Sequence, residues 1–431
     1  MEKLRVIGIL ICLIISINLN NVQANEIVPD GYTDTTIKVN ANTTNVSTKT
    51  IIDNKAFNSF AKFNVSEGNI VNLKLPGKSD ILINLVKSET STINGILNSI
   101  KQGKIGGDIF FVNPYGITIG ESGVINVGSL TAITPTVKFI DNFFIDIENP
   151  DNKYVEAIIN NKSSINPDSE IINEGTINAI ANINLNSGNV INNGILNSFA
   201  TEEAFNKDSG PDISDMVNTG KIDFSPELVL EEGNVNIVAK SNFTNRGSII
   251  LNNGNLKIAA ANDAYIKGDQ QQQIFANNID IYANNTYIND SIKVTAIDRV
   301  KLNSGFNSSI SGRANVSAAN IYLYAKNNAF IEDKPIITSS NNIILNANNY
   351  SYVDHECKLS AANLIKLNSN NADVAIEGGA FLSASNINLA AQKNAFIKDW
   401  ATVNTSNNLT LKSLTSDAFI TDNAVITSGN N

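Results

Sequence analysis

Short runs in which apolar and polar residues alternate recur along the second half of the chain. Each run opens with a polar residue, usually Asn, and then places Ile, Leu or Val at every second position, a period of two that is typical of β-strands. Successive runs start 21 to 23 residues apart, and no stretch between residues 234 and 431 shows the 3.6-residue period of a helix. The runs begin at Asn234, Asn255, Asn278, Arg299, Asn320, Asn342, Asn363, Asn386 and Asn408.

A second short run follows most of these starts after about ten residues, and it carries an aromatic residue. Examples are Ala264-Tyr-Ile, Ala329-Phe-Ile, Ser351-Tyr-Val, Ala395-Phe-Ile and Ala418-Phe-Ile. Two or three strands in each repeat of about 22 residues predict a parallel β-solenoid, in which each turn stacks on the previous one at about 4.8 Å. A β-sandwich is the alternative, but its strands would recur every ~8–12 residues with Gly-rich turns.

The first half contains a related unit, in which Asn is followed two residues later by Gly and then by apolar residues. Because Gly accepts the positive φ of a tight corner and the apolar residue starts a strand, we expect the solenoid to begin well before residue 234. The unit starts at Asn173 and Asn192, and it recurs later at Asn218 and Asn245.

The composition fits this interpretation. Hydrophobic residues make up 42% of the 431 residues and charged residues only 17%, while Asn and Ile are unusually frequent. Asn supplies corners and stacked hydrogen bonds, and Ile supplies the core. A net charge of −10 without any cluster of Lys and Arg along the sequence argues against a nucleic-acid partner.

The N-terminus has the pattern of a signal peptide. Lys3 and Arg5 precede an apolar run over residues 6–17, and the sequence Val22-Gln-Ala24 follows. We predict a Sec signal peptide over residues 1–24, cleaved after Ala24 during passage through the Sec translocon. The alternative is a retained anchoring helix, although a run of about twelve residues is short of the ~20 needed to span a bilayer.

Candidate chemistry is sparse. The chain has one His and two Cys, and Asp354-His355-Glu356-Cys357 is the one cluster of potential metal ligands. A structural zinc site needs four N or S ligands, and no second pair exists, so we predict a surface corner and no metal. The acidic stretch near residues 200–232 is interpreted as a solvated excursion from the solenoid, with a Ca²⁺ site as the less favoured alternative. We therefore predict no cofactor, no catalytic residue and no enzyme activity.

Three ordered blocks resemble a known family. The core block is Asn113-Pro114-Tyr115-Gly116-Ile117, within Gly107 to Ala132, and the upstream blocks contain Phe63-Asn64-Val65 and Ile93-Asn-Gly-Ile. They resemble the secretion domain of filamentous-haemagglutinin-like exoproteins over roughly residues 28 to 200. The family motif has Asn where Tyr115 stands, a position that we expect at the exposed second corner of the turn.

The resemblance implies an all-β fold, a right-handed parallel β-helix (solenoid) with a capped N-terminal secretion domain. It also implies two-partner secretion: the chain reaches the periplasm of a Gram-negative bacterium, and periplasmic recognition modules of an outer-membrane transporter bind the N-terminal domain. The chain then crosses the transporter unfolded. For the Asn113-Pro114 turn, a direct recognition role and a purely structural role remain open.

We accordingly predict a signal peptide over 1–24, a secretion domain over 25–233 and repeats over 234–431. The predicted product is a secreted or surface exoprotein, an adhesin or haemagglutinin-like shaft with a host or bacterial surface receptor. Two alternatives are a short relative of a contact-dependent toxin-delivery protein and, less favoured, a β-helix polysaccharide lyase or hydrolase. Because the sequence stops at Asn431 just after a repeat strand, we expect either self-association through the C-terminal coil or a truncated gene product.

Overall fold

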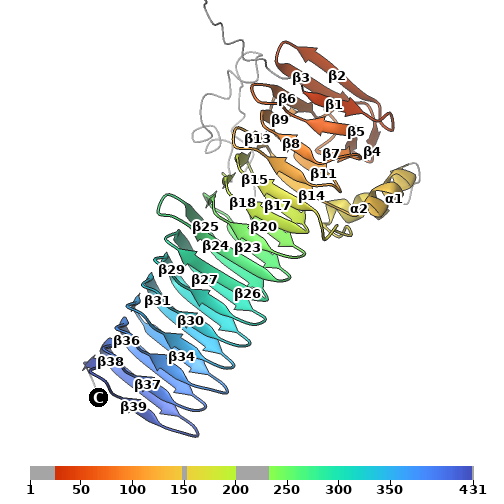
Figure 1. The fold of residues 1–431 in the computed structure, drawn as a ribbon. Coiled ribbons are helices and arrows are strands. Elements are labelled where there is room, and N and C mark those ends of the chain that lie inside the picture. The colour runs from red at the N-terminus through yellow and green to blue at the C-terminus, as the bar shows by residue number, and fades with distance from the viewer. Residues whose placement is uncertain (1–24, 148–152, 200–232, 430–431) are drawn as a thin grey trace, which may run out of the picture.

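The computed structural model describes residues 25–147, 153–199 and 233–429. Those residues form one elongated stack of β-strand coils with two short helices on its side (Figure 1). The predictions for residues 1–24, including cleavage after Ala24, and for the acidic stretch at 200–232 lie outside the described residues. Among the described residues, neither helix has the length and apolar character that a membrane span requires.

Each coil contributes strands to three faces of the stack, and strands within a face pair in parallel with the coil before and the coil after. We call them faces 1, 2 and 3. Strands of face 1 are β3 (Thr43–Thr48), β6 (Ile70–Lys74), β9 (Ile96–Lys101), β13 (Val124–Val127), β16 (Thr176–Ala179), β19 (Ile195–Ser198), β22 (Ser248–Leu251), β33 (Lys358–Ala361) and β40 (Val425–Ser428).

Strands of face 2 are β5 (Lys55–Asn64), β7 (Ile81–Val86), β11 (Asp108–Val112), β14 (Ser129–Ile133), β17 (Ile183–Ser187), β20 (Val235–Ala239), β23 (Asn255–Ala260) and β34 (Leu364–Ser369). In most of the later coils one long strand runs through faces 1 and 2, with a register shift between its two halves. These long strands are β25 (Gln273–Ala283), β27 (Lys293–Ser304), β29 (Asn315–Ala325), β31 (Ile336–Ala347), β36 (Phe381–Ala391) and β38 (Thr402–Ser413).

Face 3 is a sheet of thirteen short strands among the described residues. They are β8 (Ser91–Ile93), β12 (Ile117–Ile119), β15 (Glu170–Asn173), β18 (Asn189–Asn192), β21 (Phe243–Asn245), β24 (Asp263–Gly268), β26 (Asn285–Asp290), β28 (Ser308–Ile310), β30 (Ala329–Ile331), β32 (Ser351–Val353), β35 (Val374–Ile376), β37 (Ala395–Ile397) and β39 (Ala418–Ile420). The predicted parallel β-solenoid is therefore confirmed.

The repeat pattern read from the sequence matches the register of face 2. Ile237 pairs with Ile258 in the next coil, and the same inward position is then Ile or Leu in each coil up to Leu389, always at most 1% exposed. One predicted start is displaced by a residue: Leu364 pairs with Asn342, because Asn363 still belongs to the corner before the strand. Asn363 nevertheless donates a hydrogen bond to Asn342 across 3.0 Å.

Four strands outside the parallel faces belong to the N-terminal part. β1 (Glu26–Pro29) and β4 (Ile51–Ile52) run antiparallel to β5, β2 (Thr35–Asn40) forms a hairpin with β3, and β10 (Lys104–Ile105) folds back on β9. They make the first coils different from the rest (Figure 1). We call residues 25–147 and 153–199 the capped end, and residues 233–429 the repeat stack. β17 pairs in parallel register with β20, so coil stacking continues from one part to the other. The domain boundary between residues 233 and 234 stays a prediction.

Two helices that were not predicted from the sequence, α1 (Val137–Ile147) and α2 (Lys153–Ile159), leave the stack between β14 and β15. They cover outward apolar side chains of face 2 and form a second hydrophobic core there. Phe143 at its centre is fully buried, with its ring 6.2 Å from that of Phe57. The face-2 residues of this core are Phe57, Ile83, Leu85, Phe110, Val112 and Ile133.

Candidate functional site

The turn at Asn113 joins face 2 to face 3 in one coil and is bonded to the coils on both sides. The Asn113 side chain is fully buried, and its Nδ2 donates hydrogen bonds to the Glu89 carbonyl oxygen at 2.8 Å and to Ser91 Oγ at 3.0 Å. Its Oδ1 accepts a hydrogen bond from the Tyr115 backbone N at 2.9 Å. Every hydrogen-bonding atom of the amide is thus used inside the fold, which fixes the turn against the preceding coil.

The other residues of the turn reach both neighbouring coils. The Pro114 carbonyl oxygen accepts a hydrogen bond from Asn166 Nδ2 at 2.9 Å, and the Tyr115 carbonyl oxygen accepts one from Thr90 Oγ1 at 2.8 Å. Gly116 has a φ of +112°, and a Cβ added there would lie 3.0 Å from the Glu170 carbonyl oxygen. This combination of dihedral and close backbone accounts for Gly at the position. Ile117 starts β12 and is buried.

Tyr115 is the exposed member of the turn, with 43% of its surface open to solvent. Asn113 presents no surface, so a partner that touches this turn from outside meets the tyrosine and not the asparagine.

The Phe63-Asn64-Val65 block lies two coils further toward the N-terminus. Phe63 is fully buried and packs edge to face against Phe60 and Phe111, with ring centroids 5.0 and 5.1 Å apart. Asn64 Oδ1 accepts a hydrogen bond from the Thr92 backbone N at 2.8 Å. Val65 is buried and bridges in parallel to Ile93 of β8.

The structure brings the two blocks together through the segment 89–92. Asn64 binds this segment from one side, at Thr92 and at the Glu89 carboxylate, while Asn113 binds it from the other, at the Glu89 carbonyl and Ser91. Segment 89–92 contains the start of β8, the first strand of face 3, and the two residues before it. It was not predicted from the sequence as part of the site. The missing signal is spatial: Glu89 and Ser91 lie 24 and 22 residues before Asn113, one coil length, and the coil period was established only for the second half.

Three charged side chains, Lys62, Glu26 and Glu89, form an ion-pair group at the surface beside the site. Lys62 Nζ lies 2.9 Å from Glu26 Oε1 of β1 and 3.3 Å from Glu89 Oε1. The hydrogen bond with Glu26 raises the pKa of Lys62, and the same bond lowers the pKa of Glu26. All three side chains are solvent-accessible, so the group orients β1 on the coil but adds little to stability.

Lys87 links the N-terminal residues Asp30 and Tyr32 to helix α1. Its Nζ lies 3.4 Å from the centre of the Tyr32 ring and 3.3 Å from the centre of the Phe144 ring, with Asp30 Oδ2 at 3.6 Å. Burial lowers the pKa of Lys87, while Asp30 opposes that shift. A cation held between two rings and a carboxylate fastens the helices to the first coils.

The Asp354-His355-Glu356-Cys357 cluster forms a corner between β32 and β33, as predicted. His355 and Glu356 both have positive φ, at 54° and 55°, so the chain reverses direction there. The His355 side chain points to solvent and pairs with Asp354 at 2.8 Å, whereas Cys357 lies in the core. Burial raises the pKa of the Cys357 thiol to about 12. Histidine and cysteine therefore do not meet, and no group of three or more metal-ligating side chains exists within the described ranges.

A comparison with protein families finds one model, described as the TPS secretion domain, that matches residues 25–345. Among solved structures, the crystal structure of the HMW1 secretion domain from Haemophilus influenzae is similar at 15% identity, covering 95% of this chain and 98% of that chain with a TM-score of 0.29. Curated proteins yield no match. The family match spans the capped end and most of the repeat stack. The chain therefore belongs to the TPS secretion domain family, that is, to the exoproteins of two-partner secretion.

Proposed function

We propose that this protein is an adhesive or spacer shaft displayed outside a Gram-negative bacterium. We also propose that its outer-membrane transporter recognises the capped end. Membership in the TPS secretion domain family carries the proposal, since a two-partner secretion exoprotein requires a partner transporter. The passage through the Sec translocon and the periplasm follows from the predicted signal peptide over residues 1–24.

Two properties of the chain support export through a pore. Cys357 is the only cysteine after residue 24, so no intrachain disulfide has to be broken or formed during passage. Each coil packs on its neighbours alone, which allows the stack to form coil by coil as the chain emerges.

The adhesive or spacer role is supported by the shape. The fifteen strands that contribute to face 1, from β3 to β40, make fourteen steps of about 4.8 Å, so the described stack is about 67 Å long. Stacked coils present extended faces, and solenoid proteins use such extended surfaces for binding. The predicted receptor and the predicted self-association through the last coil remain predictions.

For the Asn113 turn we propose that Asn113 and Tyr115 have different roles. Asn113 acts structurally, because its amide is buried and fully used in bonds to segment 89–92 and Tyr115. Contact with the transporter falls to exposed groups around it, of which Tyr115 is the first candidate.

Secretion tests the proposal. The chain is expressed with its cognate outer-membrane transporter, and exported protein is quantified for Asn113→Ala, Gly116→Ala and Tyr115→Ala. We expect the first two changes to abolish export by loosening the turn, and Tyr115→Ala to reduce export without loosening the fold, as judged by hydrogen exchange. Asn342→Ala in the repeat stack is the matched control. Unchanged export of the Asn113 and Gly116 variants would contradict the proposed role of the turn.

A further inference from the structure

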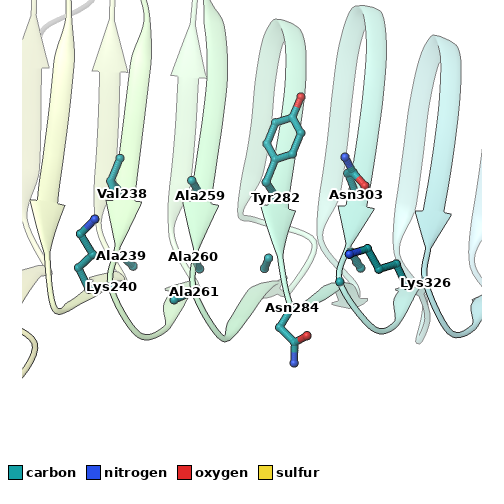
Figure 2. Close-up of a pocket in the computed structure, with 13 residues that line it drawn as sticks. Val238, Ala239, Lys240, Ala259, Ala260, Ala261, Tyr282, Asn284, Asn303 and Lys326 are labelled. Carbon is teal, nitrogen blue, oxygen red and sulfur yellow. The ribbon is translucent and has the colours of Figure 1, made fainter.

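A groove lies on the outside of the repeat stack, where face 2 turns toward face 3. It has a volume of about 600 Å³ and crosses five successive coils, from β20 to β29. Figure 2 shows its walls, with Lys240 at one end and Lys326 at the other. The lining residues are Val238, Ala239, Lys240, Ala259, Ala260, Ala261, Tyr282, Ala283, Asn284, Asn303, Ser304, Gly305 and Lys326.

The hollow arises from side-chain size along matched positions of adjacent coils. The outward position that is Tyr282 in β25 is Ala259 in β23 and Val238 in β20, so the tyrosine stands at the edge of a depression. On its other side the same position is Asn303. The Tyr282 ring stands higher than the Ala and Val side chains beside it, so these residues line a shallow channel that runs along the axis of the stack (Figure 2).

The groove is basic although the protein is acidic. The chain carries a net charge of −10, yet the lining contains two lysines and no carboxylate. Lys301 adds a third cation nearby, 5.7 Å from the centre of the Tyr282 ring. Two carboxylates beside the groove are already bonded. Asp280, two residues before Tyr282, is paired with Arg299 through two bonds of 2.9 and 2.7 Å, and Asp263, two residues after Ala261, accepts a hydrogen bond from Asn285 at 2.8 Å.

Coil stacking, not sequence proximity, assembles these charges. Lys240 and Lys326 each follow directly after the end of a face-2 strand, four coils apart, which places them about 19 Å from each other along the stack. The sequence shows them 86 positions apart, so no cluster of basic residues was visible there.

We propose that this groove binds a linear acidic polysaccharide, which lies parallel to the axis of the stack. Anionic groups of the glycan bind Lys240 and Lys326, a sugar ring packs on Tyr282, and the amides of Asn284 and Asn303 bind sugar hydroxyls. The lining contains one aromatic ring, and the next ring at the same outward position, Tyr324, lies two coils or about 10 Å away. Rings this far apart favour a glycan over a single-stranded nucleic acid, which binds through a succession of stacked bases. This inference deepens the proposed adhesive function and rests on it for the place where the ligand is met.

Binding to the purified mature chain, residues 25–431, tests the inference without any secretion step. The probes are polygalacturonate for carboxylates, dextran sulfate for sulfates, and neutral dextran. We expect one or both acidic polymers to bind, more weakly as salt increases, and neutral dextran not to bind. If the chain is not exported but the purified protein binds acidic glycans, the proposed export is wrong and this inference holds. If the chain is exported but the purified protein binds no acidic glycan, this inference is wrong and the proposed export holds.

Variants localise the binding. The double change Lys240→Ala and Lys326→Ala is expected to weaken binding about tenfold. Lys293→Ala with Lys358→Ala removes the same charge from exposed positions on face 1 and is expected to bind like the unchanged protein. Ala261→Glu places a carboxylate between the two lysines at an exposed position and is expected to abolish binding.

Three results would overturn the inference: equal loss in the two double variants, binding of neutral dextran as tight as that of the acidic polymers, or binding of a single-stranded oligonucleotide in preference to both acidic glycans.

Discussion

The capped end and the repeat stack differ in how they bury polar side chains. In the capped end, face-1 asparagines form a ladder through the interior, with each Nδ2 bonded to the Oδ1 of an asparagine in a neighbouring coil at 2.9 to 3.3 Å. Its middle members are at most 3% exposed. The ladder consists of Asn45, Asn72, Asn98, Asn126, Asn178 and Asn197.

In the repeat stack the asparagines that open the face-2 segments are partly buried, and their ladder is interrupted. They are Asn255, Asn278, Asn320, Asn342 and Asn386. Arg299 and Leu364 occupy the position held by Asn in the adjoining coils. A column that accepts arginine and leucine tolerates substitution, whereas an interior ladder leaves unsatisfied groups when a member is lost. The difference suggests that the capped end has one specified form, while coils of the repeat stack are interchangeable.

The largest expected difference comes from Asn113→Asp compared with Asn346→Asp. At Asn113 the change removes two donated hydrogen bonds and buries a carboxylate, and we expect the local free energy of opening to fall by about 3 to 5 kcal/mol. Asn346 is partly buried and accepts a bond from Asn368 Nδ2 at 2.8 Å, which Asp also accepts, so we expect a change within about 0.5 kcal/mol. Native-state hydrogen exchange of segment 89–92 and of β31 measures both.

A second comparison uses phenylalanine. Phe143→Ala empties the centre of the core beneath α1 and α2, at an expected cost of about 3 kcal/mol, and should speed exchange in the helices and β7 but not in the repeat stack. Phe396 lies on the outside of face 3, stacked on Phe419 at 5.2 Å, and its change to Ala should cost about 1 kcal/mol. Similar effects from both changes would contradict the distinction between the two regions.

The ladders give a smaller contrast. Asn126→Ala leaves Asn98 Oδ1 and Asn178 Nδ2 without their partners in the interior, with an expected cost of about 2 kcal/mol. Asn342→Ala at a partly buried corner should cost less than about 1 kcal/mol, because water can replace the lost bonds. The test compares exchange rates at the coils on either side of each substituted residue.

The smallest effect on stability at neutral pH concerns Cys357. Its pKa is raised to about 12 by burial, so the folded chain keeps the thiol protonated at pH 8 and should react with iodoacetamide far more slowly than the unfolded chain. A pKa raised above that of the unfolded state also means that stability falls as pH rises from about 9 toward 12. Fast labelling of folded protein at pH 8 would show that the His355 corner opens readily.

The sequence could predict the repeat stack because its period is carried by every coil. Strand starts such as Asn320 and Asn342 recur at one spacing, and a two-residue alternation specifies which side chains face inward. The helices α1 and α2 were not predicted, although Ile140, Phe143 and Phe144 have helical spacing. The two helices form a single insertion, so no repeat marks them in the sequence.

The candidate site could be only half predicted. Asn113 and Asn64 stand in motifs that a resemblance makes visible, but Glu89 and Ser91 become neighbours of Asn113 only when one coil is stacked on another. The basic groove has the same origin, since Lys240 and Lys326 are unremarkable one at a time. In a solenoid, a site that spans several coils depends on how the strands of adjacent coils pair. This register must be known for each coil before residues far apart in the sequence can be assigned to one site.

In this account the transporter recognises the capped end, while the repeat stack serves as a shaft. The most direct test of this distinction is to remove one whole coil from the repeat stack and measure export. Deleting residues 320–341 joins Ala319 to Asn342, which pairs in register with Asn320, so the shortened chain keeps its stacking. We predict that this chain is exported through its partner transporter as efficiently as the full chain, while Asn113→Ala is not exported. Loss of export on deleting the coil, together with normal export of Asn113→Ala, would contradict the account.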